Sequence, residues 1–168
     1  MTPSMLQTLD KIEQQLPHLI QQQKWSSLYI DYEQPIVERL WTQYDKYRIN
    51  LHKIHPCNIE NSLLHPHPWP SAMKILQGTY LQQLGHETTN NLPEIDTTIL
   101  MAQGSAYEMI NINTWHRVAP QHEPVYSIMI TGAPWNRSQP KPTKTLEPLT
   151  ITKEKELLEW FTTHYKLK

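Results

Sequence analysis

The sequence predicts a mainly β protein, a barrel or sandwich of short strands with helical segments at both ends of the chain. Two observations carry this prediction. Between residues 48 and 132, short stretches alternate apolar and polar residues and are separated by turn residues such as Gly78 and Gly104. Before and after this region, apolar residues recur at helical spacing instead. Many short strands at such close spacing are typical of an all-β barrel or sandwich.

Residues 1–47 are predicted to form a helical N-terminal segment that packs on the strands. Pro17 is expected to end a first helix and begin another, because proline lacks a backbone N–H. The next helix is expected to start at Asp31 or Glu33, with Pro35 in its first turn, and to end near Tyr47. The apolar positions that define these helices are Met5, Leu6, Leu9, Ile12, Leu16, Leu19, Ile20, Ile36, Leu40, Trp41 and Tyr44.

Residues 48–132 are predicted to form the barrel. Strands are expected at residues 48–54, 63–67, 71–76, 79–84, 95–102, 106–112 and 124–131. Polar residues 86–91 are expected to form a turn, and residues 113–114 and the region of Pro120 are expected to separate strands. In the first strand, Ile49, Leu51 and Lys53 should share one face, and Asn50, His52 and Ile54 the other.

The last part of the chain is predicted to form an arm and a helix. Residues 133–150 are rich in proline and poor in apolar residues, so an extended arm across the surface is expected. Thr152 is the expected N-cap of a C-terminal helix over residues 151–168, with Leu157, Trp160, Phe161 and Tyr165 on its apolar face. Residues 1–168 are therefore expected to form a single domain.

The composition narrows the classes of function. The 15 basic and 16 acidic residues nearly balance, which argues against a nucleic-acid-binding surface. No stretch is long and apolar enough to span a membrane, and the N-terminus lacks the pattern of a secretory signal. The single Cys57 fits a reducing cytoplasm. We therefore expect a cytoplasmic protein whose partner is a small-molecule substrate, with neither nucleic acid nor membrane as a partner, and we leave a homodimer open.

The run His65-Pro66-His67-Pro68-Trp69-Pro70 is the first candidate site. A residue before proline avoids the α region, so the run must be extended. In a β-strand, His65 and His67 would point to the same face and form a chelating pair. The alternative is a polyproline helix, in which the two imidazoles diverge. The three prolines remove hydrogen-bond donors along one edge, so an edge strand is expected.

His116 is the third candidate, because it follows a turn between two predicted strands. If those strands lie opposite His65 and His67, three imidazoles converge inside the barrel. Three neutral imidazoles suit Fe(II), Zn, Ni or Cu and leave coordination positions open for water or substrate. Structural sites usually have four protein ligands, so a site of this kind is more often catalytic.

These residues resemble the two-part signature of the cupin superfamily. The pair His65 and His67, then Gly78, then the single His116 follow the cupin order. Ser71 or Ala72 stands where cupins have a glutamate ligand, and Asn111 and Asn113 stand where they have proline and glycine. The resemblance covers roughly residues 63–132, and it implies a double-sheet β-barrel (jelly roll) with a metal inside.

With three histidines and no glutamate, the chain is similar to the thiol dioxygenase (cysteine dioxygenase-type) branch, and more closely to uncharacterised bacterial cupins with H-x-H-P-W. The runs 74–78 (K-I-L-Q-G) and 116–118 (H-R-V) carry the first likeness. It implies Fe(II) as the metal, with Zn or Ni as alternatives. Met129 and Thr131 stand where that branch has histidine and tyrosine, so we do not expect cysteine oxidation. Arg48 or Arg117 could bind a substrate carboxylate.

Weaker candidates complete the site. Tyr80 and Tyr107 could place hydroxyls near the metal, whereas Arg117 is expected to point to the opposite face from His116. His52 could reach the pocket, with a core or surface position as the default. Trp69 could wall the mouth of the pocket, with simple packing as the default. Glu108 could orient a histidine, with exposure to solvent as the default. The methionines at positions 73, 101, 109 and 129 are expected in the core.

We expect from these features a metal-dependent protein, first of all a non-haem iron dioxygenase or related oxidoreductase acting on a small molecule. His65, His67 and His116 are the expected metal ligands, and Tyr80, Tyr107 and Arg48 are the candidate catalytic groups. Two alternatives stay open at this point. One is a metal-dependent isomerase or hydrolase, and the other is a binding or storage protein without catalysis.

Overall fold

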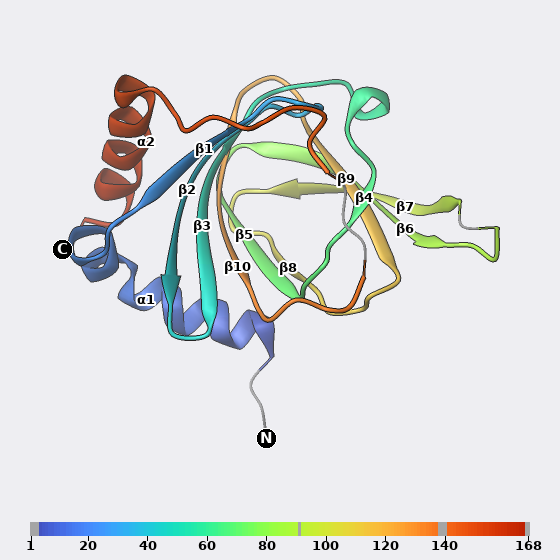
Figure 1. Ribbon diagram of the computed structural model, residues 1–168, viewed down its shortest axis with the longest axis horizontal. Coiled ribbons are helices and arrows are strands. Elements are labelled where there is room, and N and C mark those ends of the chain that lie inside the picture. The colour runs from blue at the N-terminus through green and yellow to red at the C-terminus, as the bar shows by residue number, and fades with distance from the viewer. Residues whose placement is uncertain (1–3, 91, 138–140, 167–168) are drawn as a thin grey trace.

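The strands build two antiparallel sheets, and a helix lies near each end of the described chain (Figure 1). The computed structural model describes residues 4–90, 92–137 and 141–166. The larger sheet has six strands in the order β1 (Ser26–Ile30), β2 (Val37–Tyr44), β3 (Tyr47–Ile54), β10 (Val125–Thr131), β5 (Ser71–Gln77), β8 (Ala106–Met109). The smaller has four in the order β4 (His65–Pro66), β9 (Thr114–Pro120), β6 (Thr79–Glu87), β7 (Pro93–Ala102). The helices are α1 (Met5–Gln22) and α2 (Ile151–His164), with a short 3-10 turn, η1 (Ile59–Asn61), between β3 and β4.

The outer face of the six-stranded sheet packs against the two helices. This face presents Leu40, Leu51 and Ile128 to the apolar side of α1, and Phe161 of α2 completes the cluster. These side chains are fully buried, and the predicted division of the strand over residues 48–54 into two faces is confirmed. Burial of this kind contributes about 1.5–3 kcal/mol for each large side chain, so the helices anchor the sheet.

The inner faces of the two sheets share a second apolar cluster. Ile75 and Met129 come from the larger sheet, and Tyr80 and Met101 come from the smaller one. Met109 is also buried, so all four methionines expected in the core lie there. This cluster fills one part of the space between the sheets, and a cavity occupies another part.

The helix α1 runs through Pro17 without a break, so the prediction that Pro17 divides two helices is wrong. Ser4 caps the helix and forms a reciprocal capping box with Gln7, which satisfies two N–H groups at the N-terminus. Leu16 and Leu19, on either side of the proline, are buried against the sheet. Tertiary packing of this apolar face offsets the loss of one hydrogen bond at Pro17.

The second predicted helix, ending near Tyr47, is also wrong, because β1 and β2 occupy that region. The strand β2 pairs with β3 along its whole length, and the two are joined by a tight turn at Asp45 with φ of 52°. Aspartate tolerates this left-handed conformation better than most residues. Apolar residues at positions 36, 40, 41 and 44 fit a helical period, but pairing with β3 decides the structure.

Several further boundaries differ from expectation. Strand β9 runs from Thr114 to Pro120, where residues 113–114 and the region of Pro120 were expected to separate strands. The strand expected over residues 63–67 shrinks to two residues in β4. The polar turn expected at residues 86–91 begins as the end of β6, and Asn91 lies outside the described residues. The N-cap of α2 is Thr150 rather than Thr152, and residues 167–168 of the expected helix lie outside the described part.

Residues 133–137 and 141–150 form the expected arm, apart from one isolated bridge between Glu147 and Tyr29.

Glu108 neither faces solvent freely nor orients a histidine. Its carboxylate accepts a hydrogen bond of 3.0 Å from the backbone N–H of Leu6 and so stabilises the N-terminus of α1.

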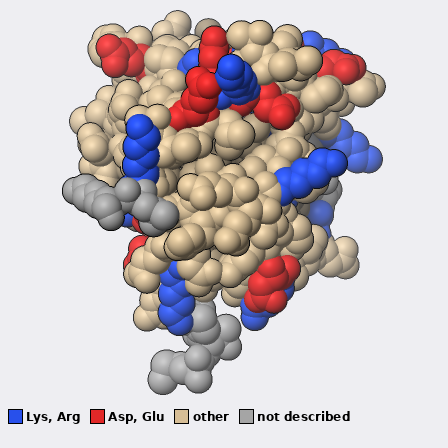
Figure 2. Space-filling view, turned by 90° about the vertical axis from the view of Figure 1, so that its left-hand side faces the viewer, with Lys and Arg blue, Asp and Glu red and all other residues tan. Residues whose placement is uncertain are grey.

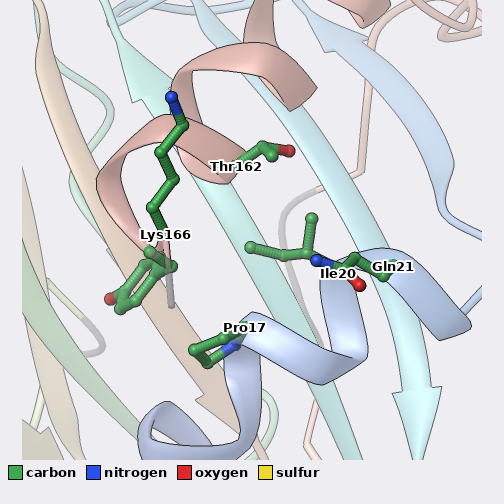
Figure 3. Close-up of a pocket in the computed structure, with 6 residues that line it drawn as sticks. Pro17, Ile20, Gln21, Thr162 and Lys166 are labelled. Atoms are coloured by element: carbon green, nitrogen blue, oxygen red, sulfur yellow. The ribbon is translucent and has the colours of Figure 1, made fainter. Parts of the chain in front are cut away.

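The surface on the side of α2 carries acidic and basic side chains intermixed (Figure 2). A small pocket of about 240 Å³ lies between α1 and α2 (Figure 3). Its described lining includes Pro17, Thr162 and Lys166 but no histidine, cysteine or carboxylate. The described lining of this pocket therefore offers none of the usual metal ligands.

Within the described ranges, no helix has the length and apolar character needed to cross a membrane.

Replacing Pro17 by alanine is expected to raise the free energy of unfolding. The change restores the N–H that can donate to the carbonyl of Glu13, and interior prolines cost a helix about 3 kcal/mol. We expect a gain of about 1–3 kcal/mol in urea denaturation followed by circular dichroism. The exposed Gln14→Ala is the control and should change stability by less than about 0.5 kcal/mol. Lower stability of Pro17→Ala would show that the proline ring is needed for packing.

Candidate metal centre

The pairing of β4 with β9 brings two histidines from distant parts of the chain together. His65 lies directly opposite His116 in this antiparallel pair, and their ring centroids are 4.8 Å apart. His67 follows two residues later, with its ring centroid 5.4 Å from that of His65 and 4.6 Å from that of His116. Each histidine offers a ring nitrogen within 4.8 Å of the others. The three imidazoles thus converge on one point inside the molecule.

The first two imidazoles are held by hydrogen bonds at Nδ1. The Nδ1 of His65 donates to the backbone carbonyl of Leu63 at 2.9 Å, and the Nδ1 of His67 lies 2.8 Å from Oγ of Ser71. A proton fixed at Nδ1 leaves the lone pair at Nε2 free for a metal, and such partners orient the ring. Ser71, which stands near the position of the cupin glutamate, therefore supports a ligand instead of being one.

His116 is held from the neighbouring strand β6. Its Nδ1 lies 3.3 Å from the amide of Gln82, which is almost completely buried. Ligation through Nε2 requires the proton at Nδ1, so the amide would present its oxygen to His116. The two ends of an amide have nearly the same shape, so this exchange keeps the side chain in place.

Burial keeps these imidazoles neutral. It lowers the pKa of His67 and His116 well below 6.5, and the charges of neighbouring histidines lower it further. Burial also lowers the pKa of His65, although the carbonyl of Leu63 opposes this shift. Neutral imidazole is the form that binds a metal. Three neutral, oriented nitrogen donors in one cluster fit a divalent transition metal with open coordination positions.

The three histidines line a cavity of about 500 Å³ between the sheets. This is within the size range of small-molecule sites. One part of its wall is apolar and includes Trp69, whose ring centroid lies 4.9 Å from that of His67, together with Met73 and Val118. Residues of the β1–β2 loop and of the arm, such as Tyr32 and Leu146, also line it.

The part of the cavity wall formed by the β2–β3 hairpin is polar and positively charged. Arg39, Arg48 and His52 line the cavity there. Nε of Arg39 donates to Nε2 of His52 at 2.9 Å, which fixes both side chains. The guanidinium of Arg48 lies over the ring of Trp41 at 3.8 Å, and its buried Nε has no hydrogen-bond partner. We call Arg39, Arg48 and His52 the cationic wall.

Two tyrosines lie beside the centre. The hydroxyls of Tyr80 and Tyr107 are 2.9 Å apart, and both contact Sδ of Met73. The ring centroid of Tyr107 is 6.5 Å from that of His116. Burial raises the pKa of Tyr107 to about 12, with opposing hydrogen bonds from Tyr80 and Gln82, so the phenol keeps its proton at neutral pH.

The structure brings together most of the residues that the sequence singled out. His65, His67 and His116 meet, Arg48, His52 and Trp69 line the cavity, and Tyr107 lies near His116. Arg117 points to the outer face, as expected, where its Nε donates to Oε1 of Gln83 at 2.7 Å.

Two residues of the site, Arg39 and Gln82, were not predicted from the sequence. Arg39 was assigned to a helix, and a strand with Arg39 and Trp41 on one face would have been needed to find it. Gln82 contacts His116 only because β6 pairs with β9, and this long-range pairing has no local pattern in the sequence.

No protein-family model matches the sequence. No curated protein matches it either. Solved structures do match the fold. A structure of Fe(II) HppE superimposes with a TM-score of 0.51 and 10% identity, over 64% of this chain and 56% of that one.

Two further structures match with slightly lower scores. A structure of hydroxypropylphosphonic acid epoxidase from S. wedmorenis gives a TM-score of 0.49 and 13% identity, over 64% of this chain and 55% of that one. A protein from Bacillus halodurans gives 0.48 and 18%, over 79% and 85%. This chain spans a little over half the length of the first two structures. At these identities the likeness is one of fold, and the mainly β, two-sheet, cupin-type fold expected from the sequence is confirmed.

The metal-free protein is expected to lose stability as the pH falls below 6.5. The buried histidines stay neutral when folded, whereas in the unfolded chain they take up protons near 6.5. Their contribution is therefore fully present above pH 6.5 and is lost as the pH falls toward their lowered pKa values. Each such group gives a slope of up to about 1.4 kcal/mol per pH unit.

His52→Gln should make this slope shallower. Burial and then the charges of Arg39 and Arg48 lower the pKa of His52, and glutamine can still accept the hydrogen bond from Arg39. The measurement is urea denaturation with a chelator at about pH 7.5 and about pH 5. His122→Gln, an exposed histidine, is the control. Equal slopes in both variants would contradict the assignment of His52 as a buried neutral group.

Proposed function

We propose that the protein is a metal-dependent enzyme, a non-haem iron oxidoreductase of the dioxygenase kind, acting on a small anionic molecule. The observation that supports this most is the cluster of three imidazoles, those of His67 and His116 buried and that of His65 half-buried, each with a hydrogen-bond partner at Nδ1. His65, His67 and His116 would hold the ion. A bound Fe(II) would supply redox chemistry with O₂ and open coordination positions.

The choice of metal rests on chemistry and on one neighbour. Imidazole donors suit Fe, Zn, Ni and Cu, so the donor set alone leaves these metals in competition. The HppE structure with a similar fold is named with Fe(II), which supports iron as the first choice. Cys57 is outside the cluster, so the donor set lacks the thiolates typical of structural zinc sites.

The residues around the cavity would bind and orient the substrate. Trp69 and Met73 offer an apolar surface beside the histidines, and Arg39 offers a positive charge on the other wall. The Tyr107 hydroxyl contacts Sδ of Met73 and the hydroxyl of Tyr80, so it would support the apolar wall rather than touch a bound molecule. Residues 32–35, 62–63 and 65–69 and two residues of the arm, Pro142 and Leu146, line the same cavity.

The purified protein is expected to contain about one divalent transition metal ion per chain, and His65→Ala with His67→Ala should remove it. Loss of two of three donors lowers metal affinity by several orders of magnitude. Metal content is measured by inductively coupled plasma mass spectrometry. The control is His18→Ala with His122→Ala, two exposed histidines, which should keep the metal. Full occupancy in the His65 and His67 variant would end the proposal.

The reaction class is tested by comparing metals. Protein loaded with Fe(II), Zn or Ni is incubated with a panel of small organic anions, and O₂ uptake is followed with an electrode. We expect O₂ uptake only with Fe(II) and only in the presence of a substrate, because the other two ions do not supply this chemistry. Turnover without O₂ would instead indicate a hydrolase or isomerase, and retention of an anion without turnover a binding protein.

A further inference from the structure

The cationic wall carries two full positive charges that the protein does not neutralise. Arg39 on β2 is paired with His52 on β3, and Arg48 lies four residues before His52 on the same strand. Because side chains alternate between the two faces of a strand, Arg39 and Arg48 lie on the same face of the hairpin. Both side chains therefore project from the inner face of the hairpin into the cavity. Within the described part of the chain, the salt bridges involve neither of them.

Among the residues that the structure describes, the groups around the two arginines supply no buried carboxylate to compensate their charge. Glu33 is the acidic residue among those lining the cavity, and it is exposed at the rim. His52 accepts from Arg39 and stays neutral, because burial and the two guanidinium charges lower its pKa. Glu38 lies next to Arg39 in the sequence but points to the outer face, where it pairs with Lys53 and Lys153.

Holding two like charges in this way costs free energy. Burial and the nearby charge of Arg48 lower the pKa of Arg39 to about 10, yet this guanidinium remains protonated at neutral pH. Arg48 keeps its place through Trp41, while its Nε lacks a hydrogen-bond partner. Both side chains are half-buried, and partly desolvated charges without a carboxylate partner are uncommon unless a site uses them. An anion with a single charge would leave one guanidinium uncompensated.

We propose that Arg39 and Arg48 form a subsite for a doubly charged tetrahedral group, the head group of a phosphate monoester or phosphonate. This inference rests on the proposed function, because it assigns the charge of the molecule that reacts at the three histidines. Three terminal oxygens can accept hydrogen bonds from both guanidinium groups at once, and two negative charges match two positive ones. Arg48 is then the residue that selects a dianion over a monoanion.

Two probes of the same shape test the charge. Ethyl phosphate and ethyl sulfate both carry three terminal oxygens on a tetrahedral centre. At about pH 8 the phosphate is doubly charged, because its second pKa is about 6, whereas the sulfate has one charge. We expect calorimetric titration of the purified protein to give an affinity for ethyl phosphate at least about tenfold higher. Equal affinities would overturn the proposal without any variant being made.

Variants then assign the preference to Arg48. Arg48→Gln should lower the affinity for ethyl phosphate about tenfold and change that for ethyl sulfate much less. Arg48→Lys keeps the charge and should keep most of the preference. Arg117→Gln, the same change on the outer face, should alter neither affinity. A preference that survives Arg48→Gln in protein with a native circular dichroism spectrum would contradict the role of Arg48.

Failure of this inference can be separated from failure of the proposed function. The titrations are repeated on the variant with His65→Ala and His67→Ala. If the preference for ethyl phosphate persists there, the cationic wall carries it. If the preference is lost together with the metal, the metal bound the phosphate and the subsite does not exist. If the wild type binds no metal but prefers ethyl phosphate, the subsite stands and the proposed enzyme does not.

Discussion

The short pairing of β4 with β9 is the constraint on which the site depends. Pro66, Pro68 and Pro70 lack N–H groups, so this segment cannot extend its ladder and stays at the edge of the smaller sheet. Other contacts fix it instead. The carbonyls of Pro68 and Pro70 accept hydrogen bonds from the N–H groups of Trp135 at 2.6 Å and Gly132 at 2.9 Å. The histidines are therefore carried on a stiff segment whose position is set by its neighbours.

The two faces of the β2–β3 hairpin have different roles: the outer face packs against the helices, and the inner face lines the cavity. On the outer face, Leu40 and Leu51 are buried under α1, and Glu38 is paired with lysines from β3 and α2. On the inner face, Arg39 lacks a carboxylate partner and lines the cavity opposite an apolar wall. Groups that lower stability are thus confined to the face that lines the cavity. This distribution is common in binding sites, where strain and unpaired charge are offset by packing elsewhere.

Local patterns predicted much of the fold and the centre of the site. Strand alternation, the apolar spacing of α1 and the extended H-x-H run were all visible in the sequence, and a mainly β fold with a helix at each end followed from them. The double-sheet form was implied by the resemblance to cupins. The largest error fell where two periods compete, and the others lie at Pro17 and at the bounds of strands and of α2. Between residues 31 and 47 the apolar spacing fits a helix, yet pairing with β3 makes a strand, because ladder formation and burial outweigh local propensity.

The sequence by itself determined which residues could bind a metal and that two of them would point the same way. Proline geometry and the two-residue spacing are local properties, so His65 and His67 needed no knowledge of the fold. Only the tertiary structure decided that His116 joins them, that Gln82 and Ser71 hold the rings, and that Arg39 faces the same cavity. Each of these depends on contact between side chains from separate segments, and where those segments meet is set by the global packing of two sheets, which no local pattern encodes.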